Sequence, residues 1–140
     1  MNLNRLVLLV AAIVFPSTLF GQTVSGYFMT KPDGGGARNR MCLREGAGGI
    51  VAVKIATAYC PAGDSECYGV RLGEIEFESK LKGGHIRYVG KGRCEIDVRV
   101  TAHGAVISQR PECRDLYLNL AADGVYELIR RDVKSDDCEI

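Results

Sequence analysis

The chain has 140 residues, with 18 lysines and arginines against 17 aspartates and glutamates. This balanced charge argues against nucleic acid as a partner and against binding to anionic membranes by charge alone, because phosphate binding needs a net positive surface. The length suits one domain with its own hydrophobic core.

The first 21 residues have the order of a secretory signal peptide. One positive charge in Met1–Arg5 precedes the unbroken apolar run Leu6–Phe15, which Pro16 ends. The run is half as long as the ~20 residues that a membrane-spanning helix needs. We expect cleavage after Gly21, or alternatively after Ser25, so that residues 22–140 form a single β-barrel domain without a membrane anchor. The sequence thus predicts a periplasmic or secreted protein, neutral overall after loss of the signal.

Short β-rich runs separated by glycine-containing turns follow, a pattern typical of a sandwich or barrel. We therefore expect an all-β fold, a small antiparallel β-barrel or sandwich of about eight strands held by disulfides. The last ten or so residues are charged, and we expect them to be loose apart from Cys138. The expected strands are Val24–Thr30, Arg40–Glu45, Ile50–Cys60, Tyr68–Glu78, His85–Val89, Arg93–Ala102, Ala105–Arg110 and a last one split into Leu116–Leu120 and Val125–Arg130.

The expected strand over residues 93–102 predicts its own pairing. Its alternate residues are apolar and the others charged, so one face points to a core. A two-residue turn at His103-Gly104 would set Val100 opposite Ile107 and Cys94 opposite Cys113. Apolar pairing and cysteine pairing agree on this register, which a bulge would shift by one residue.

The apolar pattern changes parity within the expected strand over residues 68–78. Val70 and Leu72 share one parity, whereas Ile75 and Phe77 share the other. A bulge at Gly73 would return both pairs to the same face, and bends of that kind help a sheet to curl into a barrel. We therefore expect a bulge there.

An even number of cysteines in an exported chain indicates disulfides rather than a metal site. The six cysteines are never closer than seven positions and form no pair spaced for zinc, and we expect no metal and no cofactor. The chain reversal between Cys60 and Cys67 favours a bridge there, and the strand register favours Cys94 with Cys113. Cys42 with Cys138 follows only by elimination among the fifteen possible connectivities. The expected pairs are Cys60–Cys67, Cys94–Cys113 and Cys42–Cys138.

No catalytic constellation is visible in the sequence. His85 and His103 are the only candidates for a general base at neutral pH, and both lie beside expected turns without a motif around them. Glu74, Glu76 and Glu78 share one strand face, which favours a solvated outer surface over paired catalytic carboxylates. We expect no catalytic residue, and only a meeting of a histidine with a carboxylate in a cleft would support an enzyme.

A glycine-rich polar loop follows the first expected strand and is the candidate partner-binding segment. It lacks the Lys-Ser/Thr and the helix of a phosphate-binding loop. Basic residues beside the glycines make it a candidate contact surface, although a plain linker between strands is the alternative. The candidate contact residues are Lys31, Asp33, Gly34, Gly35, Gly36, Arg38 and Arg40.

Several short motifs follow one another along the mature chain: Gly26-Tyr27-Phe28, Cys60-Pro61, Cys67-Tyr68, the run Arg71–Phe77, Cys94, Cys113 and the run Ala122–Tyr126. This order resembles small exported bacterial β-barrel proteins of unassigned function, which are similar in plan to the periplasmic inhibitors of lysozyme. The resemblance implies that the first and last strands pair to close the barrel. The inhibitory-loop motif of those inhibitors does not occur in this sequence, so no residue takes over that role.

These observations predict an exported binding protein rather than an enzyme. We expect it to inhibit or neutralise another protein of the cell envelope, as an inhibitor of lysozyme or another cell-wall hydrolase, or as a toxin immunity protein. The alternative is a barrel that holds a small apolar ligand, which large aliphatic residues at inward positions would disfavour.

Overall fold

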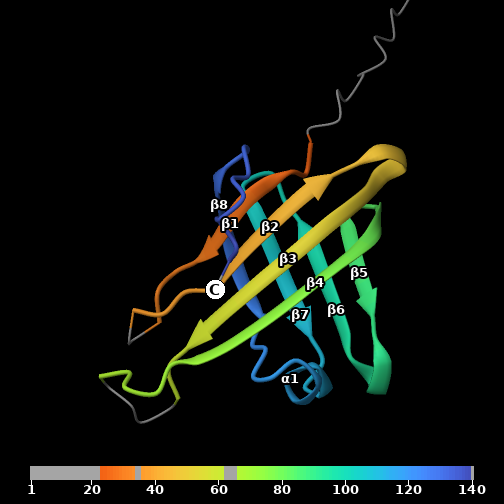
Figure 1. The fold of residues 1–140 in the computed structure, drawn as a ribbon. Coiled ribbons are helices and arrows are strands. Elements are labelled where there is room, and N and C mark those ends of the chain that lie inside the picture. The colour runs from red at the N-terminus through yellow and green to blue at the C-terminus, as the bar shows by residue number, and fades with distance from the viewer. Residues whose placement is uncertain (1–22, 34–35, 62–65, 140) are drawn as a thin grey trace, which may run out of the picture.

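The computed structural model describes residues 23–33, 36–61 and 66–139, and the expected signal peptide lies outside them. Eight antiparallel strands close into a barrel in which each strand pairs with its neighbours in sequence and β1 pairs with β8 (Figure 1). The predicted small antiparallel barrel is confirmed. The strands are β1 (Gly26–Thr30), β2 (Arg40–Glu45), β3 (Ile50–Tyr59), β4 (Arg71–Lys82), β5 (His85–Val89), β6 (Glu95–Val100), β7 (Gly104–Gln109) and β8 (Gly124–Arg130).

The barrel closes where the two ends of the chain meet. Phe28 of β1 pairs with Leu128 of β8, and Thr30 pairs with Tyr126. A Cβ on Gly104 would lie 2.1 Å from the backbone oxygen of Tyr126, so glycine lets β7 approach β8 closely enough to complete the ring. The expected pairing of the first strand with the last is confirmed.

Side chains fill the interior of the barrel. Inward positions alternate with outward ones along each strand, as in the burial of Ile75 and Phe77 between exposed glutamates of β4. A barrel of about eight strands has an interior just wide enough for its own side chains. The largest side chains with almost no exposure are Tyr126, Phe28, Met41, Leu43, Ile55, Ile86, Ile96, Leu120, Val51, Val53, Val98 and Thr57.

The register of β6 with β7 differs from the predicted one by two residues. Val100 pairs with Ala105 and Val98 with Ile107, and the N–H of Thr101 donates to the carbonyl of Gly104 at 2.9 Å. The turn is therefore Ala102-His103, one residue earlier than the expected His103-Gly104. A shift of two residues keeps every side chain on its face, so the apolar face was predicted correctly although the pairing was not.

The expected strand Leu116–Leu120 is wrong, because this part of the chain contains the short helix α1 (Glu112–Leu116) and an irregular turn. Leu118 and Asn119 have φ values of 35° and 67°, which do not occur in a strand. The helix brings Cys113 to Cys94 with 4.6 Å between their Cα atoms, although the strand register alone would not. The three expected disulfides are all present.

The expected bulge at Gly73 is also wrong. β4 pairs with β3 without interruption from Tyr59–Arg71 to Ile50–Lys80. The apolar positions along β4 change parity because Leu72 points outward, where 47% of its surface is exposed. Gly73 has a different role: a Cβ there would lie 2.7 Å from the backbone of Leu120, so glycine admits the segment after α1.

The C-terminal residues, expected to be loose, lie on the barrel wall beside β2 (Figure 1). Cys138 bonds to Cys42 and packs with Tyr27 in a small apolar cluster on the outer surface. The guanidinium of Arg130 lies 4.6 Å from the centre of the Tyr27 ring and pairs with Asp137. The disulfide and these contacts hold the tail in place.

Candidate functional site

Two loops project side by side from one end of the barrel. The first joins β1 to β2 and is the candidate partner-binding loop, and the second joins β3 to β4 (Figure 1). Gly34 and Gly35 of the first loop lie outside the described residues, as do residues 62–65 of the second. We call the described parts, residues 31–33 with 36–39 and residues 60–61 with 66–70, the loop pair.

Asp33 fastens the two loops to each other. Its carboxylate accepts hydrogen bonds from the backbone N–H of Ala37 at 2.9 Å and from that of Cys60 at 3.1 Å. The backbone N–H of Asp33 donates to the carbonyl of Ala37 at 2.9 Å, and Gly36 closes this turn with φ of 83°. Asp33, predicted as a contact residue, therefore acts inside the site by holding its shape.

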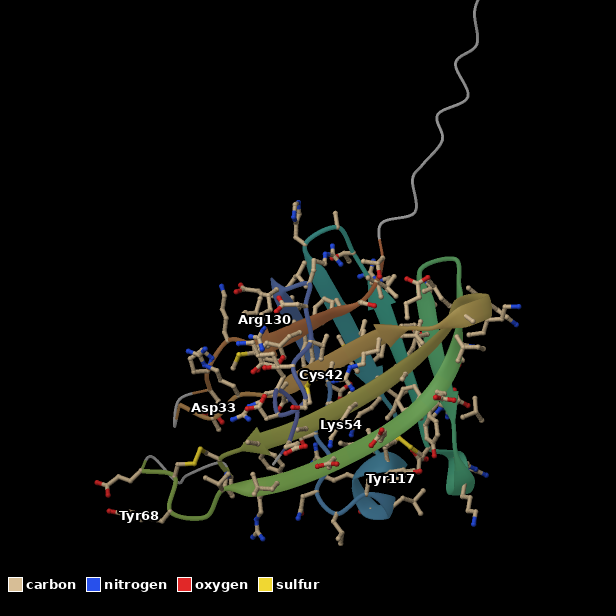
Figure 2. The ribbon with its side chains drawn as sticks, turned by 45° about the horizontal axis from the view of Figure 1, so that its top comes forward. Asp33, Cys42, Lys54, Tyr68, Tyr117 and Arg130 are labelled. Atoms are coloured by element: carbon tan, nitrogen blue, oxygen red, sulfur yellow. A yellow bond between two sulfur atoms is a disulfide. The ribbon has the colours of Figure 1, made fainter. Side chains whose placement is uncertain are left out.

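The second loop presents an aromatic side chain to solvent. The Cys60–Cys67 disulfide joins the two arms of this loop, with 5.2 Å between their Cα atoms. Directly after it, Tyr68 is 87% exposed and lies far from the barrel (Figure 2). Its hydroxyl donates to the carboxylate of Glu66, and this hydrogen bond raises the pKa of Tyr68 above the usual value. Val70, also exposed, continues the apolar character of this surface.

The predicted basic residues divide between two sides of the loop pair. Arg38 and Arg40 line a groove of about 450 Å³ between the loops, together with Glu66 and Val70. Arg40 also donates to the backbone carbonyl of Glu139 at 3.4 Å. These two arginines therefore lie beside the second loop, on the side of the C-terminal residues.

Lys31 lies on the opposite side. It faces Glu127 of β8 at 3.9 Å, and both side chains are mostly exposed, so this pair contributes little to stability. It lines a second groove, of about 520 Å³, together with Tyr59 and Asp123. The structure therefore joins Arg38 and Arg40 in one surface and separates Lys31 from them.

The loop pair has the composition of a protein-binding surface. Tyrosine and arginine are enriched where proteins contact one another, because each offers a large contact area together with hydrogen-bonding groups. Tyr68, Glu66 and Val70 were not predicted as site residues. The position of Tyr68 directly after Cys67 was the only signal for it, since a residue beside a short disulfide loop at a chain reversal is placed on the surface.

One histidine does meet a carboxylate, as an enzyme would require. The Nδ1 atom of His85 lies 2.9 Å from Asp97, which also faces Arg87 at 3.8 Å. Ser108 of β7 lies opposite Asp97 in the sheet, and Ser79 of β4 lines one groove of about 500 Å³ together with His85. The Ser79 hydroxyl donates to the carbonyl of Arg87 at 2.6 Å. The paired histidine therefore lines a groove in which the Ser79 hydroxyl is bonded to the backbone.

His103 lies exposed in the connection between β6 and β7. Among residues 23–33, 36–61 and 66–139, no three or more histidine, cysteine or carboxylate side chains are arranged to hold a metal ion. Within the same ranges, no helix is long and apolar enough to cross a membrane.

Comparison of the chain with family models, with curated proteins and with solved structures gives no match.

Proposed function

We propose that this protein is an exported binding protein that inhibits or neutralises another protein of the cell envelope through the loop pair. The observation that carries the proposal is the double fastening of the second loop, by the Cys60–Cys67 disulfide and by the hydrogen bond from Cys60 to Asp33. Three disulfides also suit an oxidising environment outside the cytoplasm.

A fastened loop suits an inhibitor because binding then orders few new torsions. Affinity gained by preorganisation comes mainly from this reduced entropic cost. Tyr68, held beyond the barrel, would enter a cleft of the target and exclude its natural substrate. The rest of the barrel would remain outside and block the approach.

The groove between the loops has two arginines against the single carboxylate of Glu66, and this net positive charge favours a target with an acidic cleft. Arg38 and Arg40 line the groove between the loops, and arginine binds carboxylates through two parallel hydrogen bonds. Glycoside hydrolases generally carry two carboxyl groups around the bond that they cleave. A cell-wall glycoside hydrolase is therefore the target class that the loop pair fits best, ahead of a toxin.

The alternative of a small apolar ligand inside the barrel has no supporting observation. Phe28, Met41 and Tyr126 are among the large buried side chains that occupy the interior. A ligand would have to displace them, which would expose or crowd residues that are now fully packed.

The test is a capture experiment with the mature protein on a solid support and extract of the cell envelope. We expect wild-type protein to retain a cell-wall hydrolase and Tyr68→Ala to lose most of it, with slowed cell-wall cleavage in the presence of wild-type protein only. Val89→Ala is the matched control, because Val89 is also exposed but lies on β5, away from the loop pair. Equal recovery by wild type and Tyr68→Ala, or no recovered protein, would contradict the proposal.

A further inference from the structure

One edge of β4 is almost entirely open. On one side β4 makes ten pairs with β3, whereas on the other side it makes only the pairs Leu81–Ile86 and Lys82–His85 with β5. Next to these two pairs, side chains join the strands: the Ser79 hydroxyl donates to the carbonyl of Arg87, and the rings of Phe77 and Tyr88 lie 4.8 Å apart. The backbone ladder does not continue there, and α1 lies at the end where the gap is wide (Figure 1). The barrel is thus closed in topology but has one seam with a short ladder.

The backbone groups that face this seam follow from the hairpin between β4 and β5. Gly83 and Gly84, with φ of 57° and 79°, form the turn, which makes Lys82 and His85 the hydrogen-bonded pair next to it. N–H and C=O groups point to alternate sides along an antiparallel strand. Four residues therefore point their backbone N–H and C=O groups into the seam: Leu72, Glu74, Glu76 and Glu78.

A row of carboxylates borders the same edge. Glu74, Glu76 and Glu78 are exposed on the outer face of β4, which confirms the expected solvated surface. Lys54 of β3 lies 3.3 Å from Glu74. Across the strands Lys54 lies opposite Glu76, whereas alanines lie opposite Glu74 and Glu78. The row of three glutamates and one lysine therefore keeps a net negative charge.

Exposed apolar residues lie near the wide end of the seam. The backbone around Asn119 and Leu120 approaches Gly73 of β4, which places the segment after α1 against the start of this strand. Leu118 in that segment is 80% exposed, and Leu72 on β4 is 47% exposed. A strand lying along β4 would cover part of this apolar surface.

We propose that the open edge of β4 binds an extended segment of a partner protein that carries Lys or Arg at every second position. The segment would add a strand to the sheet through the backbone groups of the four residues above. Its basic side chains would face the glutamate row, and the alternate side chains would turn toward the seam. This surface is separate from the loop pair and does not depend on the function proposed for it.

The charge of the edge selects this occupant over a second copy of the chain. Two copies paired through β4 would bring glutamate rows together, and like charges directly opposite one another destabilise a sheet. Charged residues on an open edge are also a common protection against self-association. A strand with basic side chains would instead place positive charges opposite the glutamate row, which is an attractive arrangement.

The test uses a fluorescent peptide of alternating lysine and valine or threonine, with binding to the full mature protein measured by anisotropy. Two control peptides have the same composition, one with its lysines in a single block and one methylated at alternate backbone nitrogens. We expect the alternating peptide to bind about tenfold or more tightly than either control, because each exposed charge pair adds little but three act together. Amide signals of residues 72–78 should shift on binding.

Two sets of variants distinguish strand addition from attraction by charge alone. Glu74→Gln with Glu76→Gln and Glu78→Gln should weaken binding about tenfold. Glu127→Gln with Asp132→Asn and Glu139→Gln removes the same charge from β8 and the C-terminal residues and should not weaken binding. Glu76→Pro removes an N–H that faces the seam and spares the ladder with β3. It should abolish binding, and the methylated peptide gives the same information if this variant fails to fold.

Equal affinity for all three peptides would overturn the proposal, as would unchanged binding by the glutamine triple variant. Tyr68→Ala should bind the peptide as wild type does. Loss of binding in that variant would also contradict the proposal, because it would place the peptide on the loop pair.

Discussion

The carboxylate of Asp33 accepts a hydrogen bond from the backbone N–H of Cys60 at 3.1 Å, which joins loops that lie 27 residues apart in the chain. The same carboxylate accepts from Ala37 within its own loop. One side chain thus sets the shape of the first loop and anchors the start of the second. The rigidity of the proposed binding surface depends on this residue.

Replacement of Asp33 by alanine should loosen both loops while the barrel stays folded. The N–H groups of Ala37 and Cys60 would lose their acceptor. A hydrogen bond to a charged group contributes about 1.5–3 kcal/mol, with the low end expected at an exposed site. Hydrogen exchange should become faster at both amides, and partner binding should weaken. Asp33→Asn keeps an acceptor oxygen, so its exchange rates should lie between those of wild type and of Asp33→Ala. Unchanged exchange in the alanine variant would contradict this role.

The three disulfides should differ in their contribution to the free energy of unfolding. The Cys42–Cys138 bridge spans 96 residues and the Cys60–Cys67 bridge only 7. In the chain-entropy model a bridge stabilises by about 4–5 kcal/mol for the long span and about 2–3 kcal/mol for the short one. Urea unfolding of the two double-alanine variants measures this order. Equal losses would mean that native contacts, rather than loop length, decide the effect.

Gly73→Ala should destabilise the protein because the new Cβ would meet the backbone of Leu120 at 2.7 Å. Overpacking of this kind costs about 1–3 kcal/mol. Gly46→Ala is the matched control, because its Cβ would have only the carbonyl of Ile50 nearby, at 3.6 Å, and its φ of −109° suits any residue. Chemical unfolding should show a clear loss for the first variant and a change within about 0.5 kcal/mol for the second. Similar losses would contradict the close approach at Gly73.

Stability should fall at high pH through the pair Tyr88 and Tyr117. The hydrogen bond between their hydroxyls raises the pKa of Tyr88 to about 12, with a further contribution from burial. The unfolded value is about 10, so the stabilisation is complete below pH 10 and is lost as the pH rises through about 12. Burial also raises the pKa of Tyr126, which adds to the same trend.

The measurement is the urea midpoint at about pH 9 and about pH 11.5, on either side of the onset of this loss. Tyr117→Phe should reduce the fall between the two conditions, because Tyr88 then lacks its hydroxyl partner. Tyr59→Phe should leave the fall unchanged, since Tyr59 is outside this pair and contacts Arg114 instead. A fall of equal size in wild type and Tyr117→Phe would show that other groups dominate.

Local patterns were enough to predict the class of fold. Arg40–Glu45 and His85–Val89 were predicted with the bounds that the structure shows. Alternation of apolar and polar residues is a property of neighbours in the chain, so it survives any detail of how strands pair. The even set of cysteines predicted the covalent framework for a similar reason, because it depends on the compartment and on proximity at turns.

Pairing and position had to come from the tertiary structure. The register of β6 with β7, the helix at Glu112–Leu116 and the outward turn of Leu72 all depend on contacts with distant segments. The same is true of the hydrogen bond between Asp33 and Cys60 and of the open edge beside Glu76. By itself the sequence determined a disulfide-bonded all-β fold. Which residues form its surfaces was decided by packing between segments, because non-local contacts select one register and one loop arrangement among several that local preferences allow.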